Sequence, residues 1–469
     1  MNTRTWNMGH YSAAALLCVP LLLVSLAGLA DTASTDNGSS TAQTISDPLV
    51  QAHHIRFGRP ELRTRALKLA IQNKDTAMIA PMLYTMIRLD TSGRREIARA
   101  LRAITGENYG DNWFRWSQYN QREQIKTIDE FDEFLFNELR LIDPDFRRFI
   151  YPGVDHRVPL QEVLWGGVAA VDGIPPLDHP PLVEAVEADY LSGSEQVFGI
   201  KIGDDVRAYP YRFMDWHEML NDTIADKPIS LAYCTLCGSG ILFDTSNTTG
   251  HYKFGSSGLL FRSNKLMFDH TTNSLWNQFT GEPVIGELAR SGKRLPQLPL
   301  VTTTWERWRQ ANPSTLVMSG ETGHERDYRP GAPYEDYFKD PQLMFPALTD
   351  DRQLAQKAKV FALRVSGANK AWSLNKFRRG RVINDTIGVL PVVLIGHKAS
   401  GEVRAYRRGK FTFKKIKGTL SQITAEGTIW QVTEHELVGP EGVRLSRLPG
   451  HIAYWFAWHN FVGSEYLAE

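Results

Sequence analysis

The chain has 469 residues, a formal net charge of +1 and 42% hydrophobic residues. This length is typical of two to four domains of about 150 residues, each able to bury its own apolar core. The 53 basic and 52 acidic residues almost cancel, so the composition argues against a nucleic-acid-binding protein. With only three cysteines, the chain cannot be a small disulfide-rich fold.

The first 30 residues resemble a secretory signal. Arg4 precedes an uncharged apolar run over residues 13–29, which ends two residues before Asp31. We therefore expect residues 1–30 to be a signal peptide and the protein to be exported and extracytoplasmic, periplasmic in a Gram-negative cell. The run is long for a cleaved signal and short for a spanning helix, so an uncleaved N-terminal anchor is the alternative and would be the only membrane attachment. Residues 31–46 are rich in Ser, Thr, Asn, Asp and Gly and predict a flexible linker.

Residues 47–150 predict a helical module. Between Pro60 and Ile104, apolar residues recur at helical spacing with a break at Gly93, which predicts three amphipathic helices. Helical patterning continues to about Arg148. Short helices in this order resemble HEAT-type repeats, and we expect a docking module for an envelope protein partner.

From residue 151 the sequence changes to short β-rich runs bounded by Gly, Pro and Asp, such as VFGIKI, ISLAYC and KLMFDH. An internal repeat organises them: the 25 residues from Leu220 align without a gap on the 25 residues from Ile383, at an offset of 163. The predicted fold is therefore α+β and multidomain, with a helical HEAT-like module followed by a duplicated, mainly antiparallel β-rich domain. The first copy is predicted over residues 151–311 and the second, a structural pseudo-repeat, over residues 360–469.

Residues 312–359 join the two copies, and we call them the connecting segment. They are polar, aromatic and without regular pattern, as in GHERDYRPGAPYEDYF. Long irregular loops of this kind are either functional or simple linkers. The position between the copies makes this one a candidate lid.

Residues that differ between the copies are the better candidates for function. The Asn-Asp-Thr-Ile turn recurs and is interpreted as scaffold, whereas Cys234 and Cys237 stand opposite His397 and Ser400 in the second copy. His217 stands opposite Gly380. The predicted site therefore belongs to the first copy alone.

The two cysteines lie in YCTLCGSG, between two predicted strands. A Cys-x-x-Cys of thioredoxin type opens a helix, and no helix follows here. A Cys-x-x-Cys-Gly turn between strands instead resembles a metal knuckle. We therefore predict a zinc or copper site with Cys234 and Cys237 as thiolate ligands, His217 as the imidazole ligand and Asp269 as a fourth ligand or a residue that orients the others.

Two other interpretations stay open. In the first, Cys234 and Cys237 form an extracytoplasmic thiol-disulfide redox pair; in the second, they are a structural disulfide in a non-enzymatic envelope binding module. Beside His217, Glu218 is expected in a surface salt bridge, and Arg262 is a candidate anion contact near the cysteines. No nucleotide fingerprint occurs, so no nucleotide cofactor is expected. Whether the protein is an enzyme is left open.

The β-rich part resembles an exported bacterial family, domain of unknown function 3179, from about residue 160 to the C-terminus. The resemblance is carried by GGVAAVDGIPPLDHP, RAYPYRFMDWHEMLND, YCTLCGSGILFD, FGSSGLLFRSNKLMFD and YWFAWHNF in this order. It implies that His217, Cys234, Cys237 and Asp269 occupy the positions of the family's own His, Cys, Cys and Asp. Thr235 stands where the family usually has proline. The resemblance implies no reaction.

Overall fold

The computed structural model describes residues 47–350 and 352–468. Chain contacts divide them into a helical unit, residues 47–154 with Pro159–Glu162, and a β-rich unit, Asp155–Val158 with residues 163–468. The predicted signal and the linker lie outside the described residues. No helix within the described ranges is long and apolar enough to cross a membrane.

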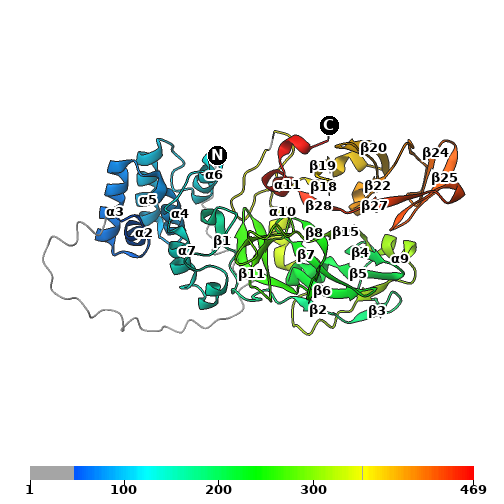
Figure 1. Ribbon diagram of the computed structural model, residues 1–469, viewed down its shortest axis with the longest axis horizontal. Coiled ribbons are helices and arrows are strands. Elements are labelled where there is room, and N and C mark those ends of the chain that lie inside the picture. Colours follow the sequence, from blue (N-terminus) through cyan, green and yellow to red (C-terminus); the bar gives the residue numbers. More distant parts are fainter. Residues whose placement is uncertain (1–46, 351, 469) are drawn as a thin grey trace. The chain divides into compact units, whose positions relative to one another are not determined.

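The helical unit confirms the predicted helical region. Its helices, blue to cyan in Figure 1, are α2 (Pro48–Phe57), α3 (Pro60–Asn73), α4 (Ile79–Met86), α5 (Thr91–Thr105), α6 (Trp113–Glu123) and α7 (Phe131–Leu139), with 3-10 turns η2 (Thr76–Met78), η3 (Pro144–Arg148) and η4 (Leu160–Glu162).

The ends of these helices follow local capping chemistry. The side chains of Asp47, Asp90 and Asn112 each accept the N–H of the third residue of α2, α5 and α6, as expected of N-cap residues. The predicted break at Gly93 is wrong, because Gly93 lies in the first turn of α5 and donates its N–H to Asp90. Buried Glu138 on α7 pairs with Arg56 at 2.6 Å and Arg88 at 2.9 Å, which ties α7 to α2 and to the end of α4.

The β-rich unit begins with three five-stranded sheets and a small hairpin. In spatial order, the strands of the first sheet are β1 (Val163–Trp165), β11 (Phe254–Phe261), β12 (Asn264–Asp269), β13 (Leu275–Asn277) and β14 (Glu282–Ile285). Those of the second sheet are β15 (Gln297–Leu298), β8 (Ser239–Asp244), β7 (Lys227–Cys234), β6 (Met219–Ile224) and β2 (Leu177–Asp178). Those of the third sheet are β16 (Val301–Thr304), β4 (Gln196–Ile202), β5 (Asp205–Pro210), β17 (Leu316–Met318) and β3 (Leu182–Glu184). The hairpin is β9 (Ser246–Asn247) and β10 (Gly250–His251). Two short helices, α8 (Tyr211–His217) and α9 (Trp305–Ala311), follow β5 and β16.

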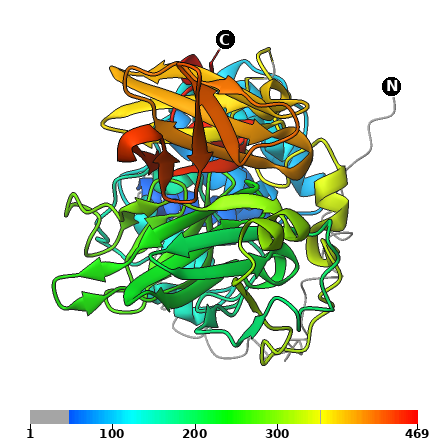
Figure 2. The same ribbon diagram turned by 90° about the vertical axis from the view of Figure 1, so that its right-hand side faces the viewer.

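The second half of this unit holds a three-stranded and an eight-stranded sheet, the latter in orange in Figure 2. The three-stranded sheet is β19 (Ala368–Ser373), β18 (Lys359–Val365), β28 (Gly450–Tyr454), and the eight-stranded sheet is β20 (Arg381–Ile387), β21 (Leu390–His397), β22 (Glu402–Arg407), β27 (Arg444–Leu448), β26 (Glu436–Val438), β25 (Thr428–Val432), β24 (Gln422–Ala425), β23 (Lys414–Lys415). The remaining elements are η5 (Ala332–Tyr334), α10 (Glu335–Lys339), η6 (Leu374–Phe377), η7 (Lys398–Ser400), η8 (Pro440–Gly442), α11 (Trp455–Phe461) and η9 (Ser464–Tyr466). Pairing is antiparallel except at β2–β6 and β5–β17, so the expected β-rich, mainly antiparallel class is confirmed.

Equivalent polar contacts occur at positions 163 residues apart. In the first half, Arg207 pairs with Asp222 at 2.8 Å, and in the second half Lys370 pairs with Asp385 at 2.8 Å. An aromatic donor binds each carboxylate at 2.7 Å, Tyr209 in the first case and Trp372 in the second. Both aspartates are therefore anchoring groups of the scaffold.

The neighbouring asparagines behave in the same way. Asn221 donates to the backbone carbonyl of Phe254 and accepts from its N–H, at 2.9 and 3.1 Å. Asn384 makes the same two bonds with Phe413, both at 2.8 Å. Each asparagine thus fixes the start of a later segment against β6 or β20: Phe254 begins β11, and Phe413 directly precedes β23.

Candidate functional site

The two cysteines sit where β7 turns into β8. The register pairs Cys234 with Ser239, and the four residues between them close the turn with a bond from Gly238 N to Thr235 O at 3.2 Å. Gly238 has φ +56°, and a Cβ at this position would lie 3.0 Å from the ring of Tyr454. The predicted tight turn without a following helix is confirmed, and glycine is required in it for both conformation and space.

Both cysteines are free thiols and almost fully buried, with exposed fractions of 1% for Cys234 and 0% for Cys237. The side chain of Cys237 is hydrogen-bonded to Cys234, and the backbone N–H groups of Lys265 and Cys237 also donate to the Cys234 sulfur. The sulfur of Cys237 lies 3.4 Å from Ser263 O and accepts an N–H from Asn264 at 3.3 Å. The two sulfurs are therefore neighbours with different surroundings.

This asymmetry gives the two thiols different acidities. Burial acts to raise the pKa of Cys234, but the hydrogen bonds from Cys237 and from the two backbone N–H groups lower it, and the pKa lies below its usual value. Burial and the adjacent Cys234 raise the pKa of Cys237 well above its usual value. Cys234 is thus the more nucleophilic thiol at neutral pH.

Glu218 is the residue whose role differs most from expectation. It is the C-cap of α8, with φ +57°, and its side chain is not on the surface but 8% exposed. One carboxylate oxygen pairs with Lys265 at 3.0 Å, and the other accepts the hydroxyl of Thr235 at 3.0 Å and that of Tyr334 at 2.9 Å. The expected surface salt bridge is therefore wrong, because the ion pair is buried beside the cysteine turn.

His217, the predicted imidazole ligand, has both ring nitrogens in hydrogen bonds. Nδ1 donates to Pro175 O at 2.8 Å, and Nε2 accepts from the hydroxyl of Tyr328 at 2.6 Å. Burial lowers the pKa of His217 to about 4, so the ring is neutral at pH 7. None of these contacts is with a cysteine.

Asp269, the predicted fourth residue, caps the turn after β12. Its carboxylate accepts N–H groups from Thr271 and Thr272 at 3.1 and 2.6 Å, the hydroxyl of Thr272 at 2.8 Å and the indole N–H of Trp276 at 2.9 Å. These four bonds fill its acceptor positions. Within residues 47–350 and 352–468, no group of three or more His, Cys, Asp or Glu side chains is arranged so that it could hold a metal ion.

Arg262 lies in the turn between β11 and β12, with its guanidinium 5.1 Å from the ring centroid of Phe261. The next residue, Ser263, is the one whose carbonyl contacts Cys237. Arg262 thus precedes a residue that contacts the cysteine turn, and its anion contact stays a prediction.

Three site residues were not predicted from the sequence. Lys265 is a buried residue of β12, followed by the apolar residues Leu266, Met267 and Phe268, and this unusual charge in NKLMFD was the available signal. Tyr334 and Tyr337 lie in the connecting segment, whose sequence has no pattern that points to a particular contact. Tyr337 donates its hydroxyl to Leu236 O, inside the cysteine turn, at 2.7 Å.

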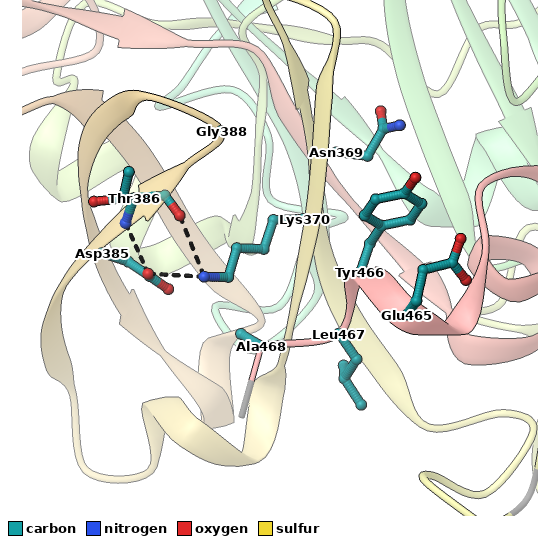
Figure 3. A pocket seen from close by; sticks show the side chains of 9 residues that line it. All are labelled: Asn369, Lys370, Asp385, Thr386, Gly388, Glu465, Tyr466, Leu467 and Ala468. Carbon is teal, nitrogen blue, oxygen red and sulfur yellow. Dashed lines mark hydrogen bonds and ion pairs between the residues drawn. The ribbon is translucent and has the colours of Figure 1, made fainter.

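A separate surface cavity lies in the second half of the β-rich unit (Figure 3). It has a volume of about 540 Å³ and is lined by Asn369, Lys370, Asp385, Thr386, Gly388, Glu465, Tyr466, Leu467 and Ala468. Its charged lining residues are Glu465 and the Lys370–Asp385 pair, and this pair links strands β19 and β20. The cavity contains none of the predicted site residues.

A family model described as a protein of unknown function, DUF3179, matches residues 171–465. The match covers the β-rich part from residue 171 to residue 465 and all four residues of the predicted metal site. No curated protein and no solved structure matches the chain.

Proposed function

Because the chain belongs to the DUF3179 family, whose description states no activity, we propose from the geometry of the site that Cys234 and Cys237 form a thiol-disulfide exchange pair. The observation that carries the proposal is the contact between two free thiols in one turn, of which only Cys234 receives two backbone N–H groups. Such donors stabilise a thiolate, the form that attacks a disulfide.

The proposed reaction consumes a substrate disulfide and oxidises the pair. The Cys234 thiolate attacks one sulfur of the substrate, so that a mixed disulfide forms and the second substrate sulfur leaves as a thiol with the proton released by Cys234. Cys237 then attacks the Cys234 sulfur, which breaks the mixed disulfide and releases the first substrate sulfur as a thiol with the proton from Cys237. The pair loses two electrons and two protons, and the substrate disulfide gains them.

The test uses glutathione disulfide with the reduced full chain. We expect the wild type to form an internal disulfide, Cys237→Ser to accumulate a glutathione adduct on Cys234, and Cys234→Ser to form neither, as read by intact mass and peptide mapping. Two free thiols that persist in the wild type at an excess of glutathione disulfide would refute the proposal. An internal disulfide that resists dithiothreitol would instead support the structural staple.

The predicted zinc or copper site remains a separate proposal with two of its ligands, Cys234 and Cys237, in one turn. The engagement of His217 by Pro175 and Tyr328 makes thiol exchange the better supported of the two. Elemental analysis of untagged protein decides between them: one equivalent of zinc or copper, lost in Cys234→Ser, would favour the metal site.

We further propose that the β-rich unit arose by internal duplication and that the second copy is structural. The paired contacts of Asp222 and Asp385 support this. At the position of the cysteines, His397 contacts Ser400 at 3.0 Å, so the second turn also brings its first and fourth side chains together, but without thiols. Replacing His397 and Ser400 by alanine should leave the exchange with glutathione disulfide unchanged, and loss of exchange in a folded variant would contradict a purely structural second copy.

For the helical unit we propose a HEAT-like docking role toward an envelope protein, in an exported protein. The proposal is tested by comparing proteins co-purified with the full chain and with a chain that lacks residues 47–154. A partner lost only with the helical unit would support it, and identical partners would not.

A further inference from the structure

The proposed exchange requires access to Cys234, and the structure closes that access. The thiols are 1% and 0% exposed, so a disulfide cannot reach either sulfur unless something moves. Two tyrosine hydroxyls of the connecting segment form hydrogen bonds at this place. Tyr337 donates to Leu236 O, in the cysteine turn, at 2.7 Å, and Tyr334 donates to the carboxylate of Glu218 at 2.9 Å. We call residues 332–339, which form η5 and α10, the gate segment.

The Tyr334 bond connects the gate segment to the cysteine turn through one carboxylate oxygen. The same oxygen of Glu218 accepts the hydroxyl of Thr235, the residue after Cys234. The other oxygen pairs with Lys265, whose backbone N–H donates to the Cys234 sulfur. Tyr334 thus binds the Glu218 carboxylate, which also contacts Thr235, the residue after Cys234, and Lys265, whose backbone N–H donates to the Cys234 sulfur.

Apart from these hydroxyl bonds, the gate segment is held by the packing of η5 against α8 and by few buried side chains of its own. In η5 no residue is buried, and in the five-residue helix α10 only Tyr337 is buried. Lys357 fastens its end, with Nζ donating to the carbonyls of Tyr337 and Asp340 and lying 3.6 Å from the Tyr337 ring centroid. A segment with so few buried side chains opens at a small free-energy cost compared with the core.

We propose that residues 332–339 are a gate over Cys234, which opens when the hydroxyls of Tyr334 and Tyr337 release Glu218 and Leu236. The gate rests on the proposed exchange for its purpose, but its opening is a property of the fold that can be measured without any substrate. The two tyrosines are access-controlling residues, and they take no part in the bond changes at sulfur.

The test measures how fast iodoacetamide alkylates Cys234 in the reduced full chain, followed by peptide mass. We expect the double variant Tyr334→Phe/Tyr337→Phe to react about tenfold faster than the wild type, because each lost hydroxyl bond lowers the cost of opening. Each single variant should give an intermediate rate. A maleimide attached to a 5 kDa polyethylene glycol should show the same acceleration, since both reagents wait for the same opening.

Tyr190→Phe is the matched control. It removes a tyrosine hydroxyl that donates to a backbone carbonyl, that of Met318, elsewhere in the same unit, and its alkylation rate should stay within twofold of the wild type. Thermal unfolding of every variant separates a local opening from a general loss of fold. Equal rates in the wild type and in a folded double variant would overturn the gate.

Glutathione disulfide separates the two proposals. If the double variant is alkylated faster but neither protein forms a disulfide with glutathione disulfide, the gate is supported and the proposed exchange falls. If the wild type forms the disulfide and the double variant forms it and is alkylated no faster, the exchange is supported and the gate falls.

Discussion

At the scale of single residues, the site is distinguished by two charged side chains that are buried, although removing a charge from water costs free energy. Glu218 and Lys265 are 6% and 3% exposed, and further hydrogen bonds to a buried ion pair offset part of the cost of its desolvation. Thr235 and Tyr334 supply such bonds to the carboxylate. The carboxylate is thereby kept buried next to the thiols.

Asp215 on α8 gives a residue-scale prediction of pH dependence. Burial is the main cause that raises the pKa of Asp215 to about 7, and repulsion from Glu218 raises it further. Hydrogen bonds from Tyr233 and Gly331 and attraction to Lys359 act in the opposite direction. Between pH 3.8, the ordinary pKa, and about 7, the folded state keeps a proton that the unfolded state has lost. The protonated Asp215 therefore contributes its full share of the free energy of unfolding below about pH 3.8. This share falls by up to about 4 kcal/mol as the pH rises to about 7.

Asp215→Asn should remove this slope. Urea unfolding at about pH 4.5 and pH 7.5 should show a wild type that loses more of its free energy of unfolding over this interval than the variant does. Parallel pH profiles for the two proteins would contradict the assignment.

At the scale of elements, the cysteine hairpin depends on its glycine. Ala at position 238 would need φ near +56° and would put a Cβ 3.0 Å from the Tyr454 ring. Gly203 in the β4–β5 turn has the same φ, but a Cβ there would lie 3.8 Å from its nearest neighbour, the Cβ of Ala225. Comparison of the two positions therefore separates backbone strain from crowding.

We expect Gly203→Ala to lower the free energy of unfolding by about 1 kcal/mol, the cost of the left-handed conformation for a residue with a Cβ. Gly238→Ala should cost about 2 to 4 kcal/mol, because overpacking against Tyr454 adds to it. Urea unfolding measures both, and equal losses would show that Tyr454 yields without cost.

At the scale of the whole β-rich unit, a buried charge network joins its two halves. Glu402 on β22 pairs with Arg307 of α9 at 2.6 Å and with Arg404. Burial acts to raise the pKa of Glu402, but Arg404 and Arg307 lower it to about 2. A backbone bond also joins the two halves: Tyr454 of β28, in the second half, donates its N–H to Cys237 O, in the first half, at 2.8 Å. The cysteine turn is therefore held by the other half of the unit.

Glu402→Gln should cost about 2 to 3 kcal/mol at pH 7, because it removes the carboxylate partner of Arg307 and one of the two carboxylates, Glu402 and Glu434, that neutralise buried Arg404. A carboxylate with a lowered pKa contributes stability above its ordinary pKa of 4.5 and loses it as pH falls toward 2. The difference from the wild type should therefore shrink at about pH 2.5 in urea unfolding. Glu282→Gln is the control, since its partner Arg294 is 61% exposed, and it should change stability by no more than about 1 kcal/mol.

The sequence by itself determined much of the architecture. Helical periodicity located the helices before Arg148, alternation located the strands, and the Cys-x-x-Cys-Gly spacing located the hairpin turn, because all three depend on interactions between residues close in the chain. The family membership followed from ordered motifs over the β-rich part. Comparison of the two segments that align at an offset of 163 residues also separated the thiols from scaffold residues such as Asp222, whose partners then proved to be Arg207 and Tyr209.

Only the tertiary structure decided which groups surround the thiols. His217 follows the sequence pattern of a ligand, but its two nitrogens are taken by Pro175 and by Tyr328, which is 111 residues away. Lys265 and Tyr334 reach Glu218 from β12 and from the connecting segment. Local periodicity contains no information on such pairs, because the burial and the direction of a polar side chain are set by how distant strands and loops pack together.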